Sequence, residues 1–78
     1  MQVLVRYFAV LRERRGREEE ALEVASGTTV AGLYGQLFAP EGQQVLPVMY
    51  AVNAAYVSGE QVLKAGDEVA FIPPLGGG

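Results

Sequence analysis

The most informative segment of the chain, residues 63–74, reads Leu-Lys-Ala-Gly-Asp-Glu-Val-Ala-Phe-Ile-Pro-Pro. Its first half is polar and contains Gly66-Asp67, a pair that is typical of a tight turn. The apolar residues 69–72 predict a short strand, within which we interpret Phe71 as a core residue. Pro73-Pro74 ends this strand, because proline cannot donate a hydrogen bond to a sheet. The segment therefore predicts a turn followed by the last strand of a sheet.

Upstream of this strand, the sequence predicts strands and helices in alternation. Apolar residues spaced i, i+3, i+4, i+7 and i+8 form one face of a helix over residues 30–38, and Ser26–Thr29 provide its N-cap signal. The other expected elements are strands at 2–8, 21–24 and 48–53, a short helix at 9–15 that ends at Gly16, and an extended piece at 56–57.

The first predicted strand has two different faces. Alternation places Leu4, Arg6 and Phe8 on one face and Val3, Val5 and Tyr7 on the other. Apolar groups on both faces favour a central strand, and the second strand is expected to run antiparallel to it. The order of elements predicts an α+β fold, with one mixed, twisted sheet and a main helix across one face.

Composition limits the classes of function. The 78 residues form one domain, half of them are hydrophobic, and the net charge of -3 argues against nucleic-acid binding. The chain contains no Cys and no His, so we expect no metal site and no catalytic thiol. No apolar run approaches the roughly 20 residues of a membrane span. We therefore expect a cytoplasmic protein.

The arginines between Arg12 and Arg17 are interpreted as a solvated helix end, balanced by neighbouring glutamates.

Three glycines, Gly76, Gly77 and Gly78, end the sequence. Ordering each glycine costs roughly 1–2 kcal/mol, so such a tail contributes nothing to folding. We expect a folded domain at 1–75 and a flexible tail at 76–78. A thin tail can enter a narrow channel, and its terminal carboxylate becomes reactive once it is joined to AMP.

Several of these segments resemble one known family. Residues 63–74 followed by the terminal Gly-Gly, together with Tyr7–Glu13, Thr29-Val30 and Ala51–Asn53, are similar to the sulfur-carrier small subunit of molybdopterin synthase. The resemblance covers essentially the whole chain in the same order. It implies the ubiquitin-like β-grasp fold, in agreement with the α+β order.

The resemblance also implies a chemistry and a set of partners. A ubiquitin-activating-type adenylyltransferase would use ATP to adenylate the Gly78 carboxylate, and a sulfurtransferase would convert it to a thiocarboxylate. The tail would then enter the large subunit of molybdopterin synthase and donate sulfur to cyclic pyranopterin monophosphate. This chain would bind no cofactor and would not be an enzyme on its own. It would contact neither nucleic acid nor a membrane.

The resemblance further implies which residues dock on these partners. Phe8, Tyr56 and Ile72 match hydrophobic docking positions, and the partner-binding set extends through Pro73, Pro74 and Leu75 to the tail. Two alternatives remain open from the sequence. One is a β-grasp sulfur carrier for thiamine, tRNA thiolation or cysteine synthesis. The other is a ubiquitin-like binding or modifier module without sulfur chemistry.

Overall fold

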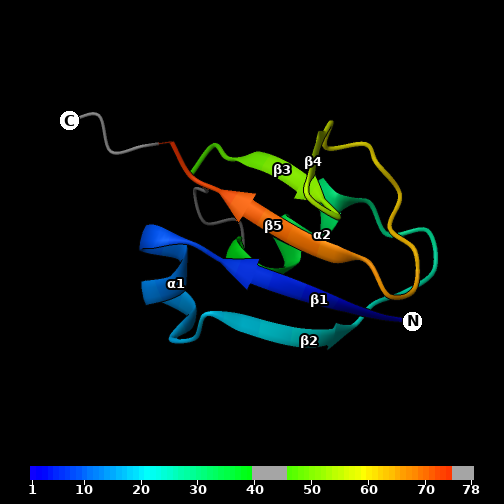
Figure 1. The fold of residues 1–78 in the computed structure, drawn as a ribbon, viewed down its shortest axis with the longest axis horizontal. Helices are drawn as coiled ribbons and strands as arrows, with labels where there is room; N and C mark the ends of the chain where they lie inside the picture. The colour runs from blue at the N-terminus through cyan, green and yellow to red at the C-terminus, as the bar shows by residue number, and fades with distance from the viewer. Residues whose placement is uncertain (40–45, 75–78) are drawn as a thin grey trace.

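The computed structural model describes residues 1–39 and 46–74 (Figure 1). Within these residues the chain forms five strands and two helices. In chain order they are β1 (Gln2–Tyr7), α1 (Ala9–Arg15), β2 (Glu19–Glu23), α2 (Val30–Phe38), β3 (Met49–Val52), β4 (Ala55–Val57) and β5 (Glu68–Ile72). The predicted helices at 9–15 and 30–38 are confirmed at both boundaries.

The strands form one mixed sheet in the order β2-β1-β5-β3-β4. β1 and β5 are parallel, and the remaining neighbours are antiparallel. β1 is therefore paired on both sides, as predicted for a central strand. Because β1 and β5 run in the same direction, they end at the same end of the sheet (Figure 1). Phe8 directly follows β1, and Pro73 directly follows β5.

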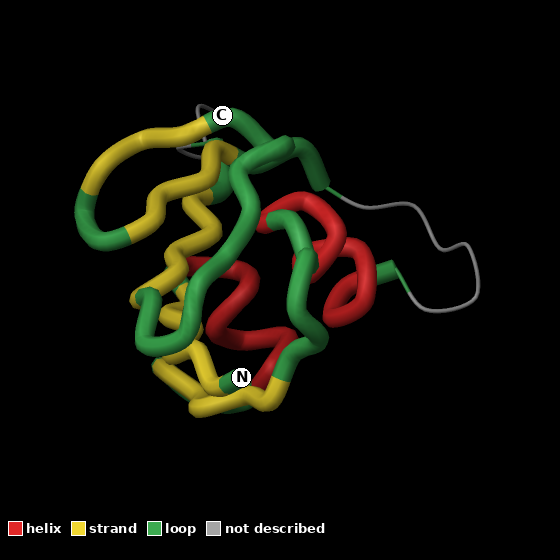
Figure 2. The backbone as a smooth tube through the Cα atoms, turned by 90° about the vertical axis from the view of Figure 1, so that its right-hand side faces the viewer, coloured by secondary structure: helices red, strands yellow, loops and turns green. Residues whose placement is uncertain are grey.

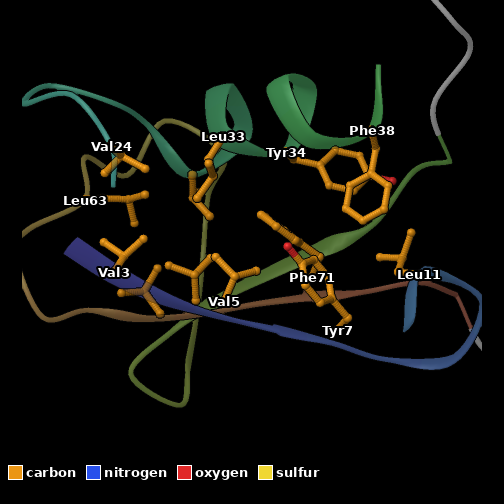
Figure 3. Packing of buried hydrophobic residues seen from close by; sticks show 13 residues of the cluster. Val3, Val5, Tyr7, Leu11, Val24, Leu33, Tyr34, Phe38, Leu63 and Phe71 are labelled. Atoms are coloured by element: carbon orange, nitrogen blue, oxygen red, sulfur yellow. The ribbon is translucent and has the colours of Figure 1, made fainter. Parts of the chain in front are cut away.

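The core lies between one face of the sheet and α2, which form two layers (Figure 2). Leu33, Tyr34 and Phe38 point from α2 toward the sheet (Figure 3). The sheet contributes Val3, Val5 and Tyr7, which the predicted alternation places on one face of β1, together with Val69 and Phe71 of β5. Phe71 is fully buried, which confirms its interpretation as a core residue. Within residues 1–39 and 46–74, no helix covers the opposite face of the sheet (Figure 2).

Both helices have the end signals that the sequence predicts. The Thr29 hydroxyl accepts a hydrogen bond from the Gly32 N–H at 3.0 Å, so it caps the first turn of α2. Gly16 adopts a left-handed conformation with φ 72° after α1, and its N–H donates to the Arg12 carbonyl at 2.8 Å.

The strand boundaries differ from the prediction by one or two residues at several ends. β2 begins at Glu19 rather than at Ala21, because Glu19 and Glu20 stand opposite Arg6 and Val5 of β1 and continue the ladder. β3 spans residues 49–52, and β5 includes Glu68. The predicted tail at 76–78, and the domain boundary at residue 75, lie outside the described residues. Neither helix of the described ranges has the length and apolar character needed to cross a bilayer.

Candidate functional site: the open face of the sheet

A groove of about 300 Å³ lies on the open face of the sheet. It brings together the three predicted docking residues Phe8, Tyr56 and Ile72. The remaining lining residues are small or charged: Ala51, Ala54, Ala70, Arg6 and Glu68. Residues from β1, β3, β4 and β5 therefore meet at one surface, although they are far apart in the sequence.

Strand alternation places each of the three apolar side chains on this face. Phe8 follows β1 directly and is 43% exposed, and Ala9 then turns the chain into α1 with φ 51°. Tyr56 stands opposite Ala51 in the β3–β4 ladder and is 67% exposed. Ile72 is partly buried and stands opposite Met49, which is exposed. Large exposed apolar side chains gathered on one face are typical of a partner surface.

A polar network that the sequence did not reveal fixes one end of the groove. The Asn53 amide donates to the Asp67 carboxylate at 2.9 Å, and Asn53 Oδ1 accepts from the Glu68 N–H at 2.9 Å. The same carboxylate accepts from the Lys64 N–H at 2.7 Å. These bonds tie the β3–β4 turn, which carries Ala54, to the start of β5. The signal in the sequence was the Asn after a strand and the Gly66-Asp67 pair.

Arg6 provides the positive charge among the residues that line the groove. Its Nε lies 3.0 Å from Glu68 Oε2 and 3.7 Å from Glu19 Oε2. All three side chains are about half exposed. An ion pair therefore lies beside the apolar residues of the groove.

The chain leaves the sheet next to a second, smaller cleft. Pro74 lines this cleft of about 240 Å³ together with Pro47, Val48 and Met49. Pro73 is buried and Pro74 is exposed, so Pro74 presents the more accessible surface of the two. The predicted contact residue Leu75 and the glycines Gly76, Gly77 and Gly78 lie outside the described residues.

Three arginines in and after the last turn of α1 are paired with glutamates. Arg12 contacts Glu18 at 3.4 Å, and Glu20 accepts from Arg15 at 2.7 Å and from Arg17 at 3.3 Å. This agrees with the interpretation of a charge-balanced helix end rather than an anion site. Although partial burial opposes it, the hydrogen bonds from Arg15 and Tyr7 lower the pKa of Glu20 overall.

Tyr7 belongs to the same network. Its hydroxyl donates to Glu20 at 2.8 Å, and the Arg15 guanidinium lies 5.6 Å from its ring centre. Burial, reinforced by the bond to Glu20, raises the pKa of Tyr7 to about 12. The network joins α1 to β1 and β2, and Tyr7, Arg15 and Glu20 do not line the groove.

Comparisons with known proteins agree with this architecture. The family model of the ThiS family matches residues 5–78. The molybdopterin synthase sulfur carrier subunit of Chlamydomonas reinhardtii is 41% identical over 83 residues, which cover 100% of each chain.

Solved structures of molybdopterin-converting factor subunits are also similar to this chain over most or all of its length. A putative molybdopterin converting factor subunit 1 from Pyrococcus furiosus is 32% identical, with a TM-score of 0.78 over 96% of this chain and 99% of that one. One chain of the complex of subunits 1 and 2 of molybdopterin-converting factor from Helicobacter pylori is 26% identical, with a TM-score of 0.65 over 100% of both chains. These matches confirm the ubiquitin-like β-grasp fold expected from the sequence. The chain belongs to the ThiS family and is related over its full length to molybdopterin synthase sulfur carrier subunits.

Proposed function

We propose that this chain is the sulfur carrier subunit of a molybdopterin synthase, and that Gly78 carries the sulfur. The observation that carries the proposal is the identity of 41% to a molybdopterin synthase sulfur carrier subunit, over the full length of both chains. The groove gives independent support, because three residues expected to dock on partners line one surface at the open face. The cargo would be passed to cyclic pyranopterin monophosphate inside the synthase.

The proposed chemistry begins at the Gly78 carboxylate. A carboxylate oxygen attacks the α-phosphorus of ATP and displaces pyrophosphate, which leaves an acyl adenylate. The terminal sulfur of a persulfide on a sulfurtransferase then attacks the acyl carbon, and AMP leaves with the bonding electron pair. A thiol of the sulfurtransferase system attacks the inner sulfur of the resulting acyl disulfide, forms a disulfide with it, and the S–S bond breaks with its electron pair on the sulfur that is bound to Gly78. The product is a thiocarboxylate on Gly78, in which sulfur has replaced one oxygen.

Other proteins supply the catalytic groups in this scheme. The chain contains neither Cys nor His, so it has no thiol to hold sulfur and no imidazole base. An adenylyltransferase of the ubiquitin-activating type would bind and consume the ATP. The large synthase subunit would supply the acid and base groups, and this chain would bind no cofactor.

Docking is proposed to use the open face of the sheet. Phe8, Tyr56 and Ile72 would fill apolar pockets of the partner, while Pro74 and Leu75 lead toward the tail. The likeness to one chain of a complex of subunits 1 and 2 from Helicobacter pylori supports a large-subunit partner. Glycines at 76–78 suit a channel, because they carry no side chain.

A second candidate is a sulfur carrier that supplies another pathway. The matching family model is that of the ThiS family as a whole, and it covers residues 5–78. The same tail chemistry would serve either pathway, so the acceptor protein distinguishes the two candidates. A large synthase subunit that binds this chain favours molybdopterin synthesis.

Mass spectrometry tests the tail chemistry. The full chain is incubated with ATP, the activating enzyme, the sulfurtransferase and a sulfur source, and its intact mass is measured. We expect the mass increase of one oxygen replaced by sulfur, located in the C-terminal peptide. A variant lacking Gly78 should fold normally and remain unmodified. An unmodified wild-type chain, or a modified Gly78-deletion variant, would refute the proposal.

A binding measurement tests the docking face. Phe8→Ala should weaken binding to the large subunit about tenfold or more, because it removes an exposed aromatic anchor. Val10→Ala is the matched control, since Val10 is also exposed but does not line the groove. It should change the affinity by less than about twofold. Equal effects of the two variants would contradict docking through this face.

A further inference from the structure

The groove combines apolar side chains with one ion pair. Arg6 and Glu68 both line it together with Phe8, Tyr56 and Ile72. The Arg6 Nε lies 3.0 Å from Glu68 Oε2, so the guanidinium holds the carboxylate at the edge of the apolar residues. Any partner that covers Phe8 and Tyr56 also covers this ion pair.

The charges of Arg6 and of the two glutamates beside it do not balance. Glu19 and Glu68 flank a single Arg6, at 3.7 Å and 3.0 Å, which leaves one negative charge in excess. Arg12, which lines the adjacent pocket, does not compensate it, because Arg12 pairs with Glu18. The whole chain also carries a net negative charge, of -3.

We propose that Glu68, held by Arg6, is a specificity-determining residue that requires a basic side chain from the large synthase subunit, the partner that the likeness to a chain of the subunit 1 and 2 complex supports. This inference rests on the proposed function, which makes the groove a docking surface. A partner that covers the groove removes water from the half-exposed carboxylates, and an uncompensated charge is unfavourable there. One Lys or Arg of the partner opposite Glu68 restores the balance, whereas an acidic side chain is repelled.

The ion pair is suited to this role because folding depends on it little. Half-exposed surface pairs contribute little to stability, and the backbone of Glu68 is held by Asn53 independently of its carboxylate. The charge of Glu68 can therefore be removed while the sheet stays intact. Binding and folding are separable at this residue.

The test measures the dissociation constant of the full-length chain with the purified large synthase subunit, at low and high salt. Glu68→Gln removes the charge at nearly constant size and should weaken binding about tenfold at low salt, with a smaller salt dependence than wild type. Glu60→Gln makes the same change of charge at an exposed loop position outside the groove, and should stay within about twofold of wild type.

Arg6→Gln gives the opposite test of the partner's charge. This substitution increases the excess of negative charge beside the groove. The Arg6→Gln variant should therefore bind the large synthase subunit as tightly as wild type does, or more tightly. Tighter binding of Glu68→Gln together with weaker binding of Arg6→Gln would overturn the inference, because it would mean that the partner offers a carboxylate to Arg6. Unchanged binding of Glu68→Gln would overturn it as well.

The outcome also separates this inference from the proposed function. When wild type binds and Phe8→Ala does not, the docking face stands, and the glutamine variants alone decide the role of Glu68. When wild type does not bind the large synthase subunit, the docking proposal and this inference are both refuted. Circular dichroism of each variant confirms that the fold is retained.

Discussion

Asn53 and Ala54 turn the chain between β3 and β4 with left-handed backbone angles of 52° and 68°. Two consecutive residues with positive φ make the tight hairpin turn in which Asn-Gly is the favoured pair. Asn53 tolerates this conformation and uses its side chain to hold Asp67. Ala54 carries a Cβ in a conformation that costs an L-residue roughly 1–2 kcal/mol.

Replacing Ala54 by glycine should therefore stabilise the protein. The relief of strain outweighs the extra freedom that glycine gives the unfolded chain, and we expect a gain of about 0.5–1 kcal/mol in the free energy of unfolding. Urea denaturation measures this change in the free energy of unfolding. Ala65→Gly is the control, because Ala65 has no positive φ, and it should lose stability instead. A loss of stability in Ala54→Gly would contradict the strain argument.

Asp67 is the buried carboxylate that organises the turn before β5. It is only 9% exposed, and its oxygens accept from the Lys64 N–H and the Asn53 amide. Asp67→Ala leaves these donors without their acceptor and should lower the free energy of unfolding by about 2 kcal/mol. Glu13→Ala, at an exposed position of α1, should change it by less than about 0.5 kcal/mol. Similar unfolding curves for both variants would show that the network is dispensable.

At the scale of elements, α2 is stabilised by packing rather than by its own composition. Four of its residues are buried against the sheet, whereas Gly32 and Gly35 interrupt it. The two glycines have different surroundings. A Cβ at Gly35 would meet open space, but a Cβ at Gly32 would lie 3.0 Å from the Thr29 hydroxyl oxygen that caps the helix.

These surroundings predict unequal effects of alanine. Gly35→Ala should raise the free energy of unfolding by about 1 kcal/mol, because alanine is the better helix former. Gly32→Ala should raise the free energy of unfolding much less, because the new Cβ would displace the Thr29 hydroxyl that caps the helix, and losing this cap costs about 1 kcal/mol. Thermal unfolding of both variants measures the difference. A larger gain at Gly32 would show that the cap contributes little.

The elements could largely be predicted from the sequence, because each has a local signal. The helical spacing of apolar residues predicted α2, Gly16 predicted the end of α1, and Thr29 predicted the start of α2. The parallel pairing of β1 with β5 could not be predicted in this way, since it joins segments that are far apart in the chain. The Arg6–Glu68 ion pair and the groove depend on that pairing, so local patterns could not reveal them either. Phe8, Tyr56 and Ile72 were identified as a set only through the family resemblance.

At the scale of the whole molecule, the two faces of the sheet have separate tasks. One face packs against α2 through an aromatic cluster, in which Tyr34 lies 5.0 Å from Phe71 and 5.2 Å from Phe38 between ring centres. The other face carries the groove. Ile72 and Ala70 line the groove and alternate along β5 with the buried Phe71, so the rigid core directly supports the open face.

The Tyr7 network links the stability of the whole fold to alkaline pH. The pKa of Tyr7 rises from its ordinary value of 10.0 to about 12 in the folded state. Between these values the unfolded chain releases the Tyr7 proton while the folded chain keeps it. Deprotonation therefore favours the unfolded state, and stability falls as the pH rises from about 10 to about 12. The expected loss from this residue is about 2–3 kcal/mol.

We expect wild type to be more stable than Tyr7→Phe near neutral pH and less stable than Tyr7→Phe at strongly alkaline pH. Near neutral pH the variant is less stable than wild type by about 1 kcal/mol, because Glu20 loses the hydroxyl that donates to it. Above pH 10 the variant lacks the titrating phenol, so its free energy of unfolding falls less steeply and the two curves converge and cross. Urea denaturation across this range measures both curves. Parallel curves for Tyr7→Phe and wild type would mean that the Tyr7 phenol ionises equally easily in both states, and that burial beside Glu20 does not hold its proton.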